Sequence, residues 1–273
     1  MLVSIFFVSL VSVGVKFIHR LSIYEIVFYK SAVALVITIG ALLHQQIPIW
    51  GKSRGLLLAR GATNALQIIL YFVTVQHIPL PTAFTIRQIT PIFTALLGVI
   101  VVKESLSLRQ LIFFAISFAG IVLLNGFVVT DASWYIFVGL ISALVGAISY
   151  VLVSKMKDKE HPLVIAVYGY LMSIFLTVPY LVNDFVIPQW HEALIIIGIS
   201  ILGYLVQYYS IKAYQYGPVA LVSASYYAGV VYTLIFSYLF FGEVLPPVKF
   251  LGLALVLLGV LLNIFYGQKR KVD

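Results

Sequence analysis

The segment HIPLPTAFTIRQITPIFTALLGVIVVKESL, residues 77–106, aligns with YGPVALVSASYYAGVVYTLIFSYLFFGEVL, residues 216–245, when the chain is shifted by 139 positions. No gap is needed at this offset over most of one half of the chain. Identical polar or helix-breaking residues coincide: Lys16 with Lys155, Tyr29 with Tyr168, Gln76 with Gln215, Pro79 with Pro218, Glu104 with Glu243 and Gly120 with Gly259. Such matches at one fixed spacing indicate an internal repeat rather than chance similarity between apolar segments.

The composition around this repeat is that of a membrane protein. Hydrophobic residues make up 62% of the 273 residues and charged residues 10%, against roughly 25% charged residues in a soluble domain. A transmembrane helix needs about 20 consecutive apolar residues. Ten segments fit this requirement, and we predict an all-α membrane protein with ten transmembrane helices: 2–19, 22–44, 57–76, 80–102, 107–127, 134–154, 162–182, 192–214, 218–241 and 247–267.

Each half of the chain holds five of these spans. Because five is odd, the second half must enter the membrane from the opposite side, which predicts two inverted five-helix repeats, residues 1–128 and 131–268. Residues 269–273 then form a short basic tail. Inverted repeats are common in secondary transporters, where two halves of equal fold open a central site alternately to each side.

The basic residues predict the orientation of the chain. If the N-terminus is inside, the inner side receives Lys52, Arg54, Arg60, Lys103, Arg109, Lys155, Lys157, Lys159, Lys212, Lys269, Arg270 and Lys271, and the outer side receives Lys16, Arg20 and Lys249. This asymmetry follows the positive-inside rule, so both termini are predicted to be cytoplasmic. The net charge of +8 is therefore interpreted as a topology signal, and no nucleic-acid partner is expected.

Two basic residues, Lys30 and Arg87, fall inside predicted spans. Each is placed about 10–12 Å from the outer end at 1.5 Å per residue. A charge at that depth usually faces a cavity or a partner, so these residues predict a cationic patch able to meet a carboxylate or phosphate. The alternatives are that Lys30 snorkels to the interface and that Arg87 pairs with carbonyl groups freed by Pro91.

Polar side chains on several spans are the candidate walls of a solute path. Arg87 shares a helix face with Ala83, Thr90 and Thr94. The predicted substrate-binding residues are Arg87, Gln67, Tyr226, Tyr227, Tyr71, Gln207, Thr90 and Lys30. Ser, Thr and Gln also form hydrogen bonds between membrane helices, so a structural role for the uncharged members stays open.

The acidic residues, the histidines and the absence of cysteine limit the chemistry. None of the nine acidic residues lies deep in a span, so a buried-carboxylate proton relay is not expected. The five histidines stand at span ends or in connections. Glu104 and Glu243 are expected to cap or pair near the turns that follow them. Because no catalytic motif, metal-ligand cluster or phosphate-binding loop is present, we expect a protein that is not an enzyme and needs no metal or cofactor.

Several motifs resemble those of the drug/metabolite transporter superfamily, and within it the EamA-type ten-span permeases. They are Phe28-Tyr29-Lys30, residues 90–97 (TPIFTALL), residues 103–106 (KESL), Glu160-His161-Pro162, Gly217-Pro218 and residues 241–244 (FGEV). The resemblance covers nearly the whole chain and implies that the third, fourth, eighth and ninth spans line the cavity. Two positions depart from the family pattern: Val8-Ser9 replaces a Trp-Gly pair, and Lys30 stands where relatives often have arginine.

These observations together predict a secondary transporter that moves a small organic metabolite by alternating access. The cationic patch favours an amino acid or another anionic or zwitterionic solute, and the lack of a proton relay favours uniport or exchange. The alternative is a drug or lipid flippase or efflux protein of the same fold. We expect a multi-pass protein of the bacterial cytoplasmic (inner) membrane, surrounded by the lipid bilayer, as a monomer or a homodimer.

Overall fold

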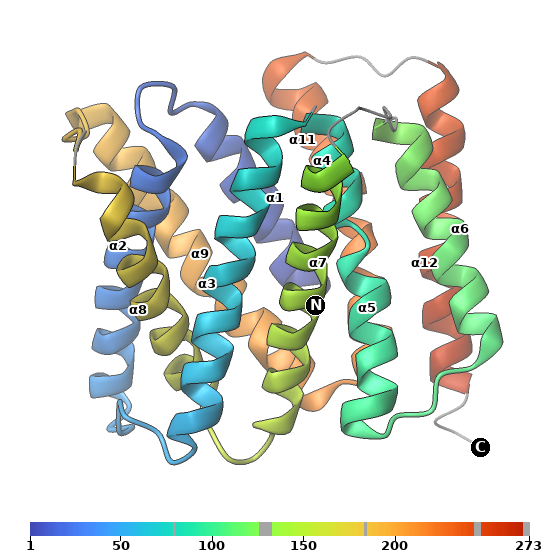
Figure 1. Ribbon diagram of the computed structural model, residues 1–273, viewed down its shortest axis with the longest axis horizontal. Coiled ribbons are helices and arrows are strands. Elements are labelled where there is room, and N and C mark those ends of the chain that lie inside the picture. The colour runs from blue at the N-terminus through green and yellow to red at the C-terminus, as the bar shows by residue number, and fades with distance from the viewer. Residues whose placement is uncertain (79, 126–132, 183–184, 243–246, 270–273) are drawn as a thin grey trace.

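In a computed structural model of the chain, residues 1–78, 80–125, 133–182, 185–242 and 247–269 are described, and every regular element among them is helical (Figure 1). The elements are α1 (Leu2–Lys16), α2 (Ile23–His44), α3 (Arg54–His77), α4 (Leu80–Arg87), α5 (Thr90–Leu97), η1 (Gly98–Val102), α6 (Leu108–Asn125), α7 (Ser133–Lys155), α8 (Pro162–Leu181), α9 (Trp190–Tyr216), α10 (Val219–Ser225), η2 (Tyr226–Ala228), α11 (Gly229–Phe241) and α12 (Pro247–Lys269). The prediction of an all-helical chain is confirmed for these residues.

The helices have the length and apolar surface of a multi-pass membrane protein. Seven segments of the described chain are long and apolar enough to cross a bilayer: Ile23–His44, Arg54–His77, Thr82–Val102, Trp134–Lys155, Pro162–Leu181, Trp190–Tyr216 and Val219–Phe240. Three shorter apolar helices accompany them, Leu2–Val15, Leu108–Leu124 and Phe250–Tyr266. Large apolar side chains such as Val36 and Phe175 are 71% exposed, and lipid solvates such a surface where water would not.

The predicted span 80–102 is not one regular helix, and Pro91 is the reason. Proline has no N–H group, so it cannot donate to the carbonyl of Arg87 four residues earlier. The Thr90 hydroxyl donates to that carbonyl instead, at 2.7 Å. The helix therefore ends at Arg87 as α4 and restarts at Thr90 as α5, which places Arg87 at an interruption in the middle of a span.

The second half has an interruption at the position 139 residues later. There the chain passes from α10 through the short 3₁₀-helix η2 into α11. The Tyr227 hydroxyl of η2 donates to the Gln88 carbonyl at the first interruption, at 2.9 Å, and these two residues are themselves 139 positions apart. Lys103 and Gly242, another pair at this offset, both have positive φ, 61° and 64°. The two interruptions therefore meet and stabilise each other.

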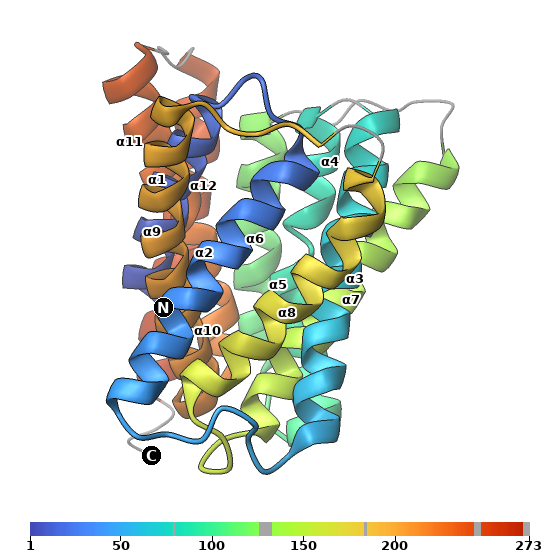
Figure 2. The same cartoon turned by 90° about the vertical axis from the view of Figure 1, so that its left-hand side faces the viewer.

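The pairing of α6 with α12 shows the same spacing. A Cβ added at Gly120 would lie 2.5 Å from the Gly252 carbonyl oxygen, and one at Gly259 would lie 2.6 Å from the Phe113 carbonyl oxygen. Phe113 and Gly252 are 139 positions apart, as are Gly120 and Gly259, so the two contacts are equivalent. Helices α6 and α12 lie side by side at one edge of the bundle, and α2 and α8 cross each other at another (Figures 1 and 2).

Candidate functional site

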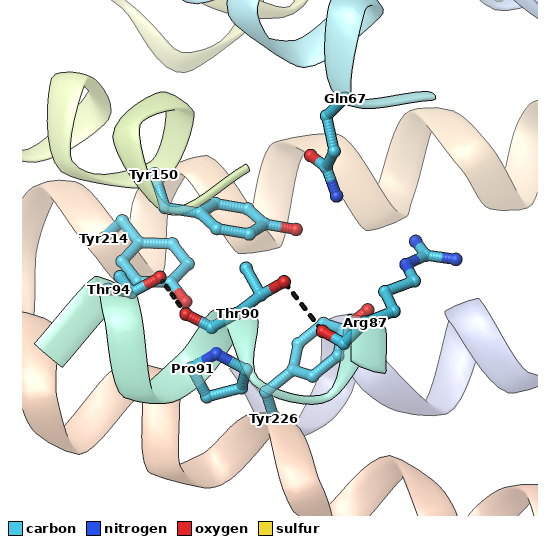
Figure 3. Close-up of a pocket in the computed structure, with 8 residues that line it drawn as sticks. All are labelled: Gln67, Arg87, Thr90, Pro91, Thr94, Tyr150, Tyr214 and Tyr226. Carbon is cyan, nitrogen blue, oxygen red and sulfur yellow. Dashed lines mark hydrogen bonds between the residues drawn. The ribbon is translucent and has the colours of Figure 1, made fainter. Parts of the chain in front are cut away.

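A small cavity lies in the middle of the bundle, where the interrupted helices meet. Its volume is about 10 Å³, close to the minimum that holds one water molecule. Eight residues of α3, α4, α5, α7, α9 and η2 line it: Gln67, Arg87, Thr90, Pro91, Thr94, Tyr150, Tyr214 and Tyr226. Figure 3 shows the Gln67 amide, the Tyr150 hydroxyl and the Arg87 side chain turned toward the same space. A charged donor and several neutral polar groups therefore converge on one point.

Arg87 is held in this cavity by aromatic rings. Its guanidinium carbon lies 4.8 Å from the centre of the Tyr71 ring, a distance at which a cation is attracted to a ring face. Arg87 also interacts electrostatically with the phenols of Tyr226 and Tyr150 and with Lys30, which is itself basic. None of these described partners is a carboxylate, so the arginine charge has no carboxylate counter-ion within the described part of the cavity.

The other cavity walls are fixed by packing and by local hydrogen bonds. Gln67 lies against Gly146 of α7, where an added Cβ would come within 2.6 Å of its amide carbon. The hydroxyl of Thr94 donates to the Thr90 carbonyl at 2.8 Å. The threonine donors are therefore used by the backbone, whereas their hydroxyl oxygens can still accept a hydrogen bond.

The structure brings together five of the predicted binding residues. Arg87, Gln67, Thr90 and Tyr226 line the cavity, and Tyr71 lies beneath the Arg87 guanidinium. Lys30 interacts electrostatically with Arg87 but is not one of the lining residues.

The remaining two predicted residues, Tyr227 and Gln207, lie away from the cavity. Tyr227 is fully buried in a different cluster, which includes Phe114 and Val256. Its hydroxyl donates a hydrogen bond to the Gln88 carbonyl. Gln207 accepts a hydrogen bond from Arg60 at 3.0 Å.

Three residues near the cavity were missed from the sequence. Tyr150 and Tyr214 line the cavity, although their partners at the 139-residue offset, Val11 and Val75, are apolar. Arg60, counted above with the charges of the inner side, is 2% exposed and lies within the helix bundle. The sequence did contain one sign that Arg60 is buried, since residue 60 falls inside the predicted span 57–76.

A much larger cleft lies next to the cavity. Its volume is about 620 Å³, and its lining includes Lys103, Lys157, Ser105, Gln110 and the residues Gln215–Pro218. Glu104 is the one carboxylate among the lining residues, and it accepts hydrogen bonds from the N–H groups of Val219 and Ala220, at 2.8 and 3.4 Å. Glu104 thus caps the start of α10, and the remaining charged side chains of the cleft are basic.

Two stacked tyrosine rings separate the cavity from the cleft. Tyr214 borders both spaces. The Tyr150 ring stacks on it with a centroid distance of 4.7 Å and an interplanar angle of 19°. The stacked pair therefore stands where the cavity and the cleft adjoin.

At the end of the bundle opposite the cleft, polar contacts join the connection after α1 and the start of α2 to residues 185–192. Arg20, after α1, forms an ion pair with Glu192 at 2.9 Å and donates to the Ile187 carbonyl at 2.7 Å. The Val186 N–H donates to Glu25 at 2.6 Å, and the Tyr29 hydroxyl donates to the Val186 carbonyl at 3.0 Å. The connection after α1 is thereby tied to residues 185–189, which close this end.

Similar proteins are transporters. The sequence profile of the EamA-like transporter family matches residues 1–126 and again residues 133–265. The pseudopaline exporter CntI of Pseudomonas aeruginosa is 25% identical over 237 residues, 85% of this chain and 82% of the relative. An uncharacterized transporter of Helicobacter pylori is 29% identical over 74% of this chain and 71% of its own length.

A third relative and a solved structure extend this picture. The S-adenosylmethionine uptake transporter of Rickettsia prowazekii is 22% identical over 81% of this chain and 72% of its own length. A protein of known crystal structure has the same fold, with a TM-score of 0.89 and 14% identity over 98% of this chain and 96% of its own. The profile matches nearly the whole chain in two successive copies, so the protein is a multi-pass membrane transporter for small molecules and belongs to the EamA-like transporter family.

Proposed function

We propose that this protein is a secondary transporter that moves a small anionic or zwitterionic organic metabolite, such as an amino acid, across the bacterial cytoplasmic membrane. The observation that carries the proposal is the central cavity, where Arg87 meets neutral phenols and an amide and no carboxylate of the described residues. A buried charge without a counter-ion is costly. A carboxylate or phosphate of the solute would supply the missing partner.

The proposed mechanism is alternating access between two inverted five-helix repeats, residues 1–128 and 131–268. Three observations support it: the two helix interruptions 139 residues apart, the hydrogen bond between Tyr227 and Gln88 at that spacing, and the equivalent glycine contacts of α6 and α12. Interrupted helices at corresponding positions of two halves often mark the binding site of a transporter. Here they surround the cavity.

The described conformation fits one half of such a cycle. The cleft reaches the end that carries Lys103 and Lys157, whereas the end that carries Arg20 and Glu192 is tied together. If the positive-inside rule applies, the open end faces the cytoplasm. The stacked Tyr150–Tyr214 pair then closes the cavity from the cytoplasmic side, with the cleft as its vestibule.

Cysteine labelling tests this topology, and the chain has no native cysteine to remove. Ile187, at the tied end, is 74% exposed, and Lys157, at the cleft end, is exposed as well. We expect Ile187→Cys to react with a membrane-impermeant maleimide in intact cells and Lys157→Cys to react only after permeabilisation. The reverse pattern would contradict the proposed orientation.

Counterflow in proteoliposomes tests the proposed activity and its coupling. Vesicles loaded with unlabelled amino acids, nucleotides or vitamins should accumulate the labelled substrate by exchange. Because the described spans provide no deep carboxylate, exchange should proceed unchanged when an ionophore collapses the pH gradient. Uptake that depends strictly on the gradient would refute the uniport or exchange mechanism. A lack of exchange with any water-soluble pool would favour a drug or lipid flippase of the same fold.

A further inference from the structure

Arg60 is a buried cation that lies outside the cavity already described. It belongs to α3, six residues beyond the first residue of that helix, and is 2% exposed. An ionisable side chain within a membrane span is expensive and usually has a specific partner or a functional role. The partners of Arg60 therefore decide which of these explanations applies.

The hydrogen bonds of Arg60 are incomplete. Nη2 donates to the Gln207 side-chain oxygen at 3.0 Å, but Nε and Nη1 have no hydrogen-bond partner among the described residues. Its electrostatic partners within the described chain are the phenols of Tyr150 and Tyr170 and include no carboxylate. Buried donors are normally paired, and the unpaired ones each cost about 1–3 kcal/mol. A purely structural arginine would be expected to use these donors.

Arg60 and Arg87 have Tyr150 as a common electrostatic partner. Tyr150 lines the cavity and interacts electrostatically with both arginines. Gln67, on the same helix α3 as Arg60, also lines the cavity. It lies seven residues beyond Arg60, or about 10 Å at 1.5 Å per residue. The two guanidinium groups, neither of which has a carboxylate partner among the described residues, therefore share Tyr150 as a neighbour that lines the cavity.

Helices α7 and α8 both pack against α3, which carries Arg60. A Cβ at Gly169 of α8 would collide with Nη1, so α8 closes that side. Tyr150, stacked on Tyr214 between cavity and cleft, covers another. Displacement of Tyr150 by the solute is the movement by which we expect the Arg60 and Arg87 sites to join.

We infer that Arg60 is a second anion-binding residue and that the transported solute carries two anionic groups, one for Arg87 and one for Arg60. This inference rests on the proposed function and specifies its substrate class as diacids, including amino diacids. Arginine suits both positions because its guanidinium stays charged when buried and donates to carboxylate and phosphate oxygens. A monoacid would satisfy one guanidinium and leave the other unpaired.

The test is ligand binding by the purified full-length protein, measured as thermal shift at constant ionic strength. The probes are acids of equal carbon number: butyrate against succinate, valerate against glutarate, and 2-aminobutyrate against aspartate. For at least one pair, wild type should bind the diacid about ten to a hundred times more tightly, the value of an added charged hydrogen bond. Equal binding within every pair would overturn the inference without any variant.

Three variants locate the second anion site. Arg60→Gln should lose the preference for the diacid and keep binding of the monoacid, whereas Arg60→Lys, which keeps a charge, should retain part of the preference. Arg54→Gln is the matched control, since Arg54 lies on the same helix but is exposed, and it should behave like wild type. If Arg60→Gln retains the full preference, Arg60 is structural. If Arg60→Gln does not fold, a reduced preference in a folded Arg60→Lys supports the inference, and full retention overturns it.

The outcomes separate this inference from the proposed function. If wild type exchanges monoacids and diacids equally well in liposomes, the anion transporter stands and the second site fails. If wild type neither binds nor exchanges any monoacid or diacid, the proposed anionic or zwitterionic substrate is wrong. The inference that Arg60 binds a second anionic group then fails as well.

Discussion

Replacing Arg87 with alanine should abolish transport while the protein still folds and inserts. The variant removes the charged donor of the central cavity and leaves the substrate anion without its partner inside the helix bundle. A hydrogen bond to a charged group contributes about 1.5–3 kcal/mol, so substrate affinity alone should fall roughly ten- to a hundredfold. Stability should change little, since Arg87 forms no ion pair with a described carboxylate that its loss would leave exposed.

Two further variants make this prediction specific. Arg109→Ala is the matched control. The Arg109 guanidinium also lies over a tyrosine ring, that of Tyr266 at 5.7 Å, but Arg109 is exposed at the start of α6 and does not line the cavity. This variant should transport like wild type. Arg87→Lys keeps the charge but loses the planar group that stacks on Tyr71, so intermediate transport is expected. Proteoliposome uptake together with size-exclusion profiles gives both readouts. Wild-type uptake by Arg87→Ala would remove Arg87 from the site.

The helical membrane fold was readable from the sequence because the lipid environment imposes a simple rule. Every span must satisfy its backbone internally and present apolar side chains outward, so runs such as residues 134–154 predict helices directly. The charged residues were informative for the same reason. A cation such as Arg87 inside an apolar run needs a partner or a cavity, and the structure places it at one.

The two aromatic residues that close the cavity were not predictable in this way. Tyrosine is amphipathic and common at the ends of membrane helices, so Tyr150 and Tyr214 carry no signal of their own. Their position follows from how α7 packs against α5 and α9, which is a tertiary property. Tyr227 illustrates the converse. It follows the lining residue Tyr226 in sequence, but successive residues on the 3₁₀-helix η2 point about 120° apart, and the Tyr227 hydroxyl donates to the Gln88 carbonyl.

The burial of Arg60 was not recognised from the sequence because the positive-inside rule already accounted for its charge. Counting basic residues by side gave a strong asymmetry, and Arg60 was grouped with Lys52 and Arg54 because they are close in sequence. The structure separates them, since Lys52 and Arg54 are exposed and Arg60 is buried a turn and a half further along α3. The asymmetry persists without Arg60, so the orientation prediction does not depend on it.

Gly120→Ala should lower the stability of the protein. The new Cβ would meet the Gly252 carbonyl oxygen at 2.5 Å and the Val256 nitrogen at 2.8 Å. These are backbone atoms and cannot rotate away, so α6 and α12 must move apart. Overpacking of this kind costs about 1–3 kcal/mol, and close glycine contacts are a main source of association between membrane helices. A thermal melt in detergent should show the loss.

The equivalent contact at Gly259 gives this prediction its internal control. Gly259→Ala would place its Cβ 2.6 Å from the Phe113 carbonyl oxygen, so a similar loss is expected. Because either variant already separates α6 from α12, the double variant should lose less than the sum of the two. Gly198→Ala, in α9, meets no heavy atom within 4 Å and should melt at or slightly above the wild-type temperature, as replacing a helical glycine usually does. Losses that add fully would mean that the two glycines do not share one helix contact, and the equivalence of the two halves at this interface would fail.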